Sequence, residues 1–574
     1  MLRPAGRSPA THARTHRENG DKAFRAGSRA AILATSAAPL LWIAQAGLLA
    51  WSVGRLADGA GLADMLAPAL AFVALGVLRA SAEAWGARRL FAAARLHLAR
   101  LRDDAARALA ARSPLDRARL PSGQAASALA EQAEAVLPWL VRYQPARLRT
   151  MLVPPAIALA VLVFSWSAAL ILVLAAPLIP LFMAVIGWRA KAASEAQLQV
   201  VGGMSGFLLD RLRGLSTLRA LGAVDATAGR VRATAEQVRA GTMRVLRIAF
   251  LSSTALELFS ALGVALVAVY VGFHLLGEIG PGSWGTRLSL SEGLFVLLLA
   301  PAFFEPLREL AAVWHDKAAG EAALAALERL REDGLALPGA LETNRQPPRA
   351  GQAPRAPSVD IEGLVFGHPG EAPLFDGEDL YVGAGEHVAL VGPSGSGKTT
   401  LLSIVAGLVA ANGGAVRIGG VPLDARSAAD LRARMAWIGQ GPHVFPGSVR
   451  ANVALERDGV TRAMVGAAVR RAGLGHVQHA TPGASLGEGG LGLSGGELVR
   501  LALARAVAAP HAGLLLVDEP TAHLDRDTAA GVIEALVELA QGRTLVVATH
   551  DLALAARLGR VVRLGEPLNK RSAA

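Results

Sequence analysis

Six long apolar runs dominate the first half of the chain. They lie near residues 31–53, 65–86, 148–166, 168–188, 249–276 and 290–312. A helix needs about 20 apolar residues to cross a bilayer, so the pattern predicts a transmembrane domain of six helices within residues 31–335. The polar and basic residues 1–30 precede it as an N-terminal arm. This arm lacks the layout of a signal peptide because the apolar run after it is too long.

Two long polar gaps interrupt the apolar runs, one between the second and third and one between the fourth and fifth. Ala, Leu and Arg recur there at helical spacing, so we expect helices that leave the bilayer, reverse and return. Breaks at Ser113-Pro114-Leu115-Asp116 and Leu120-Pro121-Ser122-Gly123 mark one reversal. Both gaps are rich in Arg, which places them and both termini on the cytoplasmic side.

The second half of the chain follows a different pattern. A Pro-rich and Arg-rich stretch within 336–358 reads as a linker. Short apolar runs then alternate with helical segments over residues 359–566, which predicts an α/β nucleotide-binding domain, and residues 567–574 form a C-terminal tail. The expected fold is a membrane all-α six-helix domain fused to an α/β P-loop NTPase domain.

Composition supports a membrane location. Of the 574 residues, 52% are hydrophobic and only 18% are charged, against about 25% charged in soluble proteins. The net charge of +12 does not indicate a nucleic-acid partner, because no basic stripe interleaved with aromatic residues is present. The chain has no cysteine, so any functional thiol belongs to a cargo.

A glycine-rich loop carries the clearest chemistry. It follows the strand-like run 386–390 and precedes a helical pattern that begins at Leu401, the context of a phosphate-binding loop. Its residues are Gly392, Pro393, Ser394, Gly395, Ser396, Gly397, Lys398, Thr399 and Thr400. Inward backbone N–H groups would hold the phosphates of ATP. Lys398 would reach the β- and γ-phosphates, and Thr399 would bind Mg²⁺.

Two acidic residues end a later buried strand, 514–519. Asp518 would hold Mg²⁺ through water, and Glu519 would polarise the attacking water. Gln440, at the end of the strand-like run 435–440, would contact Mg²⁺ and the same water. His550, after the strand 545–549, would contact the γ-phosphate. Taken alone, each residue could have a purely structural role in a turn, in a helix cap or in hydrogen bonds to its neighbours. The occurrence of all these motifs in this order favours the catalytic interpretation.

A second anion-binding helix start lies between these motifs. Ser494, Gly495, Gly496 and Glu497 open the helical run 501–506, where N–H groups would face a phosphate. Asp525 follows in His523-Leu524-Asp525 as a further nucleotide-site candidate.

Together these motifs resemble ABC ATPases over residues 359–564, and the reversing helices resemble type IV ABC exporters. The resemblance implies that two such domains enclose two ATP molecules, each between one P-loop and the other domain's Ser494-type signature. It also implies that the reversals seat in the nucleotide domain as coupling helices. Two positions depart from the family. His368 stands where an aromatic residue usually stacks on adenine, and Glu497 stands where Gln is usual.

The membrane segments resemble the D subunits of the CydDC exporters, on residues 242–270 and on 299–310 with 314–318. This resemblance implies a heterodimer with a C-type half-transporter in the bilayer of the bacterial inner membrane. It implies a cargo of reduced thiols such as glutathione and cysteine, and a role in cytochrome bd assembly. Haem is a further ligand or cargo that the family suggests. The residues themselves leave the cargo open.

Polar residues in the spans are candidate functional groups because they are costly in lipid. Glu257, within a span, and His274, near the outer end of one, are such candidates, and a helix–helix hydrogen bond or an interfacial position is the plainer alternative for each. Arg308 and His315 fit a solvated extension of the sixth helix. A homodimeric lipid or drug exporter would share every ATPase motif and stays an alternative.

Overall fold

The structure is a computed structural model that describes residues 24, 27–177, 179, 207–208, 211–212, 214–280, 282–285, 287–332, 334–340, 355–477, 480–487, 492–509 and 511–565. It divides into two compact units. The first contains residues 1–105 and 122–331, and the second contains residues 106–121 and 332–574. The expected C-terminal tail and most of the expected N-terminal arm and linker lie outside the described residues.

The described residues of the first unit form helices joined by turns and loops, with no strand among them. Its α-helices are α2 (Leu41–Ala57), α3 (Leu66–Ala110), α4 (Ser122–Ala130), α5 (Val136–Pro138), α6 (Gln144–Leu162), α7 (Trp166–Ala175), α9 (Leu215–Ala220), α10 (Val224–Leu276), α11 (Leu290–Ala312) and α12 (Trp314–Arg329). Short turns of other helix types are η1 (Ala38–Leu40), η2 (Leu62–Met65), η3 (Gln132–Ala135) and η4 (Trp139–Tyr143). The last of these is a π-helical turn.

Five helical stretches of the described chain are long and apolar enough to cross a membrane. They are Gly27–Ala57, Leu62–Ala110, Ser122–Leu162, Thr254–Leu276 and Leu290–Arg329. These match five of the six expected spans. The expected fourth span, 168–188, lies partly outside the described residues, and its described portion includes α7.

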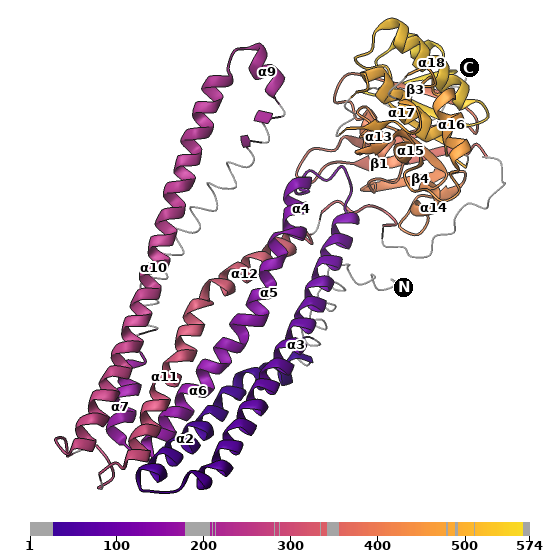
Figure 1. The fold of residues 1–574 in the computed structure, drawn as a ribbon. Coiled ribbons are helices and arrows are strands. Elements are labelled where there is room, and N and C mark those ends of the chain that lie inside the picture. Colours follow the sequence, from indigo (N-terminus) through magenta and orange to yellow (C-terminus); the bar gives the residue numbers. More distant parts are fainter. Residues whose placement is uncertain are drawn as a thin grey trace. The chain divides into compact units, whose positions relative to one another are not determined.

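Helix α11 is central to this unit, since it packs against α2, α6 and α10. Figure 1 shows these helices side by side, with α10 as a single long rod. Close packing of α10 on α11 depends on Gly263, where a Cβ would lie 2.4 Å from the Phe304 ring. Phe304 and Leu299 on α11 are almost fully buried. A larger residue than glycine at 263 would therefore force the two helices apart.

The second unit contains the α/β domain. Its strands are β1 (Val359–Phe366), β2 (Phe375–Val382), β3 (His387–Val391), β4 (Gly413–Ile418), β5 (Val421–Pro422), β6 (Met435–Ile438), β7 (Gly447–Ser448), β8 (Ser485–Leu486), β9 (Leu514–Asp518), β10 (Thr544–Ala548) and β11 (Arg560–Arg563). Its helices are α13 (Lys398–Val405), α14 (Ala428–Arg432), α15 (Val449–Ala454), α16 (Arg462–Arg471), α17 (Gly495–Val507), α18 (Arg526–Ala540) and α19 (Leu552–Ala556).

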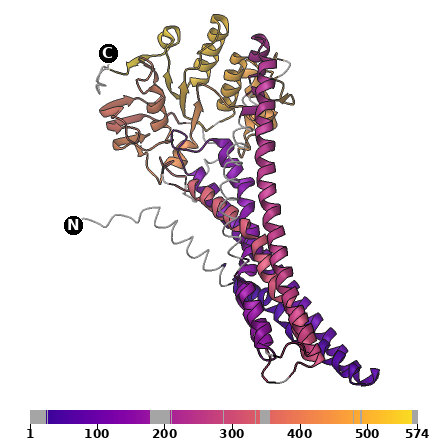
Figure 2. The same cartoon turned by 90° about the vertical axis from the view of Figure 1, so that its left-hand side faces the viewer.

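The central sheet has the order β11-β3-β10-β9-β6. Every pairing in it is parallel. Strands β9 and β10 are buried along their whole length, which explains their continuous apolar sequences. Because parallel strands end at one edge, the residues after β3, β6, β9 and β10 meet there. A second, antiparallel sheet has the order β2-β1-β4-β5. Figure 2 gives a second view of this domain's strands and helices.

The first reversal, residues 106–121, belongs to the same compact unit as the α/β domain. The Ser113 N–H donates to the Leu335 carbonyl oxygen at 2.8 Å, and the Leu337 N–H donates to the Ala111 carbonyl oxygen at 2.8 Å. Leu115 packs on the core formed by β1, β3 and α13. These contacts agree with the expectation that the first reversal docks on the nucleotide-binding domain.

Candidate functional site

The glycine-rich loop lies between β3 and α13, as its sequence predicts. Gly397 adopts φ +91°, a left-handed conformation that suits glycine, and it is the N-cap of α13. A Cβ at Gly392 would lie 2.7 Å from the Leu564 carbonyl oxygen. Glycine is therefore required at 392 for close backbone approach and at 397 for backbone conformation. The loop leaves the first N–H groups of α13 available to an anion.

Lys398 is 7% exposed and lies folded against its own loop. Its Nζ donates to the Gly392 and Pro393 carbonyl oxygens at 2.9 and 3.1 Å. It also lies 3.2 Å from Nε2 of His550. The ammonium group is therefore at the mouth of the loop, where phosphate oxygens can replace carbonyl oxygens as its partners.

Thr399 and Asp518 meet at the start of α13 and the end of β9. The Thr399 Oγ1 donates to Asp518 Oδ2 at 2.9 Å. Asp518 is 3% exposed, and this burial raises the pKa of its carboxyl group, while Thr399 and Lys398 oppose the shift. Asp518 Oδ1 is buried without a partner among the described residues. A free carboxylate oxygen beside a hydroxyl is a donor set of the kind that Mg²⁺ takes, so these residues fit the metal.

Glu519 follows Asp518 in a strained backbone conformation, with φ +47°. Its carboxylate lies 3.1 Å from His550 Nε2, and it accepts a hydrogen bond from the His550 backbone N–H at 3.3 Å. Its own N–H donates to the Ala548 carbonyl oxygen at 2.9 Å. The adjacent ends of β9 and β10 thus hold Glu519 and His550 together. Gln440 is exposed after β6, at the same edge of the sheet.

The predicted signature begins α17. The Ser494 Oγ accepts from the Glu497 N–H at 3.4 Å, and the Glu497 carboxylate accepts from the Ser494 N–H at 2.7 Å. This is a capping box. A Cβ at Gly496 would lie 2.3 Å from the Thr528 side chain, so glycine at 496 allows α17 to approach α18. Glu497 therefore has a local structural role that the sequence comparison with Gln did not predict.

Asp525 caps α18 and lies near this contact. Its Oδ1 accepts from the Thr528 backbone N–H at 2.9 Å. That hydrogen bond is the main cause of a lowered pKa for the Asp525 carboxyl group. Since Thr528 also lies beside Gly496, the structure brings Asp525 next to the signature.

His368 follows β1 and is half-buried. Its ring meets the Phe366 ring edge-on, with centroids 5.4 Å apart, and its Nδ1 is buried without a partner among the described residues. Glu371, three residues on, pairs with Arg117 of the first reversal. An ion pair thus links the turn that contains His368 to the first reversal, residues 106–121.

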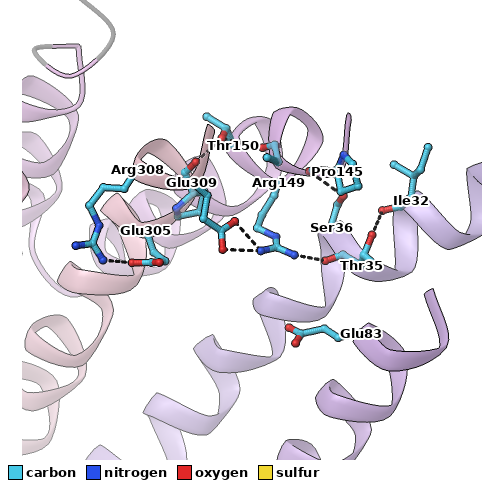
Figure 3. Close-up of polar contacts among 12 residues, drawn as sticks. Ile32, Thr35, Ser36, Glu83, Pro145, Arg149, Thr150, Glu305, Arg308 and Glu309 are labelled. Carbon is cyan, nitrogen blue, oxygen red and sulfur yellow. Dashed lines mark hydrogen bonds and ion pairs between the residues drawn. The ribbon is translucent and has the colours of Figure 1, made fainter. Parts of the chain in front are cut away.

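The membrane helices contain charged groups that the sequence reading missed. Arg149 on α6 binds both carboxylate oxygens of Glu309 on α11, at 2.9 and 2.6 Å, and donates to the Thr35 carbonyl oxygen at 3.0 Å (Figure 3). Arg308 pairs with Glu305 and lies 3.7 Å from Glu257. The sequence signal that could have identified these residues is a charged side chain inside an apolar run. That signal was used for Glu257, whereas Arg308 was assigned to a solvated helix face.

His274 and His315 have different surroundings. His274 is fully buried, near Tyr270, and neither ring nitrogen has a partner among the described residues. His315 is exposed and lies 3.2 Å from Asp316, in agreement with a solvated extension of the sixth helix.

Comparison with known families gives the same architecture. Residues 30–298 match the ABC transporter transmembrane region, and residues 375–522 match the ABC transporter family. The chain belongs to the ABC transporter family. The fold is also that of a solved structure, a bacterial Atm1-family ABC exporter with ATP bound, which is similar with a TM-score of 0.71, covering 95% of this chain and 94% of that one at 22% identity.

Relatives of known name include two CydD proteins, each named glutathione/L-cysteine transport system ATP-binding/permease protein. The chain is 36% identical to the one from Haemophilus influenzae over 75% of its own length and 72% of the relative. It is 37% identical to the one from Escherichia coli, over 75% and 73%. A CydC protein from Bacillus subtilis is 30% identical over 72% and 70%. This ABC exporter binds ATP and couples its hydrolysis to transport across a membrane.

Proposed function

We propose that the chain is one half of a heterodimeric exporter that moves reduced thiols, glutathione and cysteine, across the bacterial inner membrane. The observation that carries this proposal is the extent of its similarity to the CydD proteins. The match to the Haemophilus influenzae protein includes 442 residues, more than the whole α/β domain. It therefore extends into the membrane domain, which contacts the cargo in an exporter.

A second half-transporter is needed to complete the ATP-binding sites. One chain supplies one phosphate-binding loop and one signature helix, whereas the family's sites each combine a loop with the partner's signature. The similarity to a CydC protein as well as to CydD proteins favours a related, C-type chain as the partner. The ATPase domains would lie in the cytoplasm, and the exported thiols would support cytochrome bd assembly in the periplasm.

The ATPase site offers a specific role for each residue. Lys398 and the N–H groups of residues 392–400 would bind the phosphates. Thr399 and Asp518 would hold Mg²⁺, with Gln440 beside it, and the metal would supply charge stabilisation at the transferred phosphoryl group. Glu519 would orient the attacking water, and His550, held 3.1 Å from it, would contact the γ-phosphate. Ser494, Gly495 and Gly496, with Asp525 nearby, would serve the nucleotide bound by the partner.

Transport into inside-out membrane vesicles tests this function. Vesicles containing this chain and its C-type partner would be given ATP and radiolabelled cysteine, glutathione or haem. We expect ATP-dependent uptake of both thiols that Glu519→Gln in this chain, combined with the equivalent change in the partner, abolishes. Uptake of haem without either thiol would replace the thiol proposal, and full transport by this chain alone would refute the heterodimer.

A further inference from the structure

The loop that joins α10 to α11 lies at one end of the membrane domain, beside the turn between α6 and α7 (Figure 1, lower left). The structure describes residues 277–280, 282–285 and 287–289 of this loop, and we call them the outer loop. The Arg-rich part of α10 is at the opposite end of that helix. Because Arg-rich segments stay on the cytoplasmic side, we expect the outer loop to be on the far side of the membrane.

Ser165 fastens the outer loop to the helices. It is fully buried and is the N-cap of α7. Its Oγ donates to the Gly282 carbonyl oxygen at 2.7 Å and lies 3.0 Å from the Tyr270 hydroxyl oxygen. A Cβ at Gly282, where φ is +132°, would lie only 2.2 Å from that hydroxyl oxygen. Ser165, Tyr270 and Gly282 therefore join α7, α10 and the outer loop at one point, which we call the Ser165 clip.

Beyond the clip, the outer loop buries little apolar surface. Ile279 is half-buried and packs on the core of the membrane domain. Trp284 donates from Nε1 to the Leu162 carbonyl oxygen at 2.8 Å, but the residue is 66% exposed. Gly277 and Gly285 have φ values of +83° and +96°, which glycine adopts readily. A segment with few apolar contacts and glycines near its ends can open locally at a small cost in free energy.

His274 lies beside the clip without a hydrogen-bond partner. It is one turn beyond Tyr270 on α10, and the two ring centroids are 5.6 Å apart. His274 is fully buried, and neither ring nitrogen has a partner among the described residues. A neutral imidazole has one donor and one acceptor nitrogen, and burial of such groups without partners is unfavourable. The closed arrangement of the outer loop therefore includes a group that would gain from hydration.

Water is close to this point of the structure. Tryptophan is enriched where a membrane domain passes from lipid to water, and both Trp166 and Trp284 are exposed at this end. Opening of the outer loop here would give the ring nitrogens of His274 water as a partner. Closing it again would restore the hydrogen bonds of the Ser165 clip. The free energies of these two groups act in opposite directions, which favours a loop with two accessible positions.

We infer that the outer loop is a lid that opens during transport. The Ser165 clip holds the lid closed, and the buried, unpartnered His274 favours its opening. Tyr270 and His274 are positioning residues, since they act on the lid and not on the cargo. This inference rests on the proposed export function, in which the cargo leaves at this end of the membrane domain.

A single cysteine reports the position of the lid. The chain has no cysteine of its own, so Ser167→Cys introduces the one thiol of this chain. The Ser167 N–H donates to the Gly282 carbonyl oxygen at 3.3 Å, and a Cβ at Gly282 would lie 2.7 Å from the Ser167 Oγ. The complete complex in lipid nanodiscs would be treated with a bulky maleimide, and the mass shift of this chain would be followed against time on a gel.

The labelling rate would be measured without nucleotide and with ATP, the latter in a complex that has Glu519→Gln and the equivalent change in the partner. We expect the two rates to differ severalfold, because the lid opens at one stage of the transport cycle. Equal rates would show that the outer loop does not move, and would overturn the inference.

Two variants should change the labelling rate in opposite directions. His274→Leu removes the unpartnered nitrogens and should lower the rate about tenfold. Tyr270→Phe removes a hydroxyl from the clip and should raise it severalfold. The matched control is Ser260→Ala, which removes another buried hydroxyl of α10 that has no partner among the described residues, and it should label as wild type. His274→Met, which also needs no hydrogen bond, replaces the Leu variant if that variant does not assemble.

The same variants without the reporter cysteine would be tested for ATP-dependent uptake of cysteine into inside-out vesicles. His274→Leu should lower kcat and leave KM unchanged, because the lid acts on release and not on cargo binding. Labelling rates that rise in both variants would assign His274 and Tyr270 to structural support alone and refute the lid. Unchanged labelling in both, with normal cysteine uptake, would also refute the lid and leave the export function standing. Labelling that responds to nucleotide and to both variants, without uptake of any thiol, would refute the proposed cargo and retain the lid.

Discussion

The nucleotide site and the charged residues Glu257, Glu305 and Arg308 of α10 and α11 use the same side-chain chemistry in different ways. In the nucleotide site Lys398 and Asp518 are almost fully buried, with close hydrogen-bond partners at the ends of β3 and β9. In the membrane domain the Glu257 side chain is largely exposed, and the Arg308 guanidinium lies 3.7 Å from its carboxylate. The backbone fixes the first set before any ligand binds. The second set lies on the surface of the membrane domain, and the longer contact between Glu257 and Arg308 holds these side chains less tightly.

The largest expected effect concerns Glu519 and Lys398. Glu519→Gln should lower ATP turnover at least a hundredfold, as expected when a general base is lost, and should leave ATP affinity unchanged. Lys398→Ala should weaken ATP affinity because it removes a charge from the ground-state complex. Turnover and equilibrium binding of a nucleotide analogue would be measured on the purified complex, with the partner's equivalent glutamate removed in the first case. Wild-type turnover by the Glu519→Gln complex would contradict the assignment.

The Arg149–Glu309 pair should matter to stability more than to cargo choice. Arg149→Gln leaves a partly buried carboxylate without its partner, so we expect a loss of about 1–3 kcal/mol in the stability of the membrane domain. The double variant Arg149→Gln/Glu309→Gln should recover part of that loss. Thermal unfolding in detergent measures both. A double variant less stable than the sum of the two single variants would show that the pair does not act as a unit.

Asp518 gives a pH-dependent prediction. Burial raises the pKa of its carboxyl group, so the folded domain keeps this proton to a higher pH than the unfolded chain does. The associated stability is present at low pH and decreases as pH rises from the ordinary value of 3.8. Without nucleotide, Asp518→Asn should therefore melt higher than wild type near neutral pH, by about 2–4 °C, and the difference should vanish in acid. Equal melting temperatures at all pH values would contradict it.

A smaller effect is expected at Glu497. Glutamine also forms a capping box, so Glu497→Gln should keep α17 intact while removing a negative charge from a helix start that would face phosphate. ATP affinity of the complex should rise severalfold. Glu497→Ala is the control, because it loses the cap and should lower stability by about 1 kcal/mol. Unchanged ATP affinity in the Gln variant would show that this carboxylate does not approach the nucleotide.

The smallest effect concerns His368. If its ring stacks on adenine, His368→Tyr should tighten ATP binding severalfold, since stacking on a nucleic-acid base is worth about 1–3 kcal/mol. Titration of a nucleotide analogue into wild type, His368→Ala and His368→Tyr would decide. Equal affinities would assign His368 to the turn after β1 alone.

The site motifs were predictable because each depends on a few neighbouring residues. A glycine run between a strand and a helix produces a phosphate loop, and acids after a buried strand lie at a sheet edge. The sequence accordingly assigned Thr399 and Asp518 to one Mg²⁺ site and Glu519 and His550 to the reacting end of ATP, and the structure brings the members of each pair together. It did not predict the capping role of Glu497, because the comparison with Gln considered the nucleotide and not the helix itself.

The membrane contacts show what a one-dimensional reading lacks. Arg149, Glu305 and Glu309 stand in apolar runs that were recognised as spans, yet no spacing rule relates a residue on α6 to one on α11. Arg308 was assigned to a solvated extension of the sixth helix. Its contact with Glu257, on another helix, depends on how closely α10 and α11 pack, and that closeness rests on Gly263 opposite Phe304.

By itself, the sequence determined the spans, the α/β domain and the order of the ATPase motifs, since hydrophobic period and glycine placement act over short distances. Only the tertiary structure decided which charges face one another across helices and which remain unpaired. It also decided that residues 106–121 pair with residues 335–337 in the compact unit of the ATPase domain. Such contacts join distant segments, and their energy depends on burial and distance, which exist only once the chain is packed.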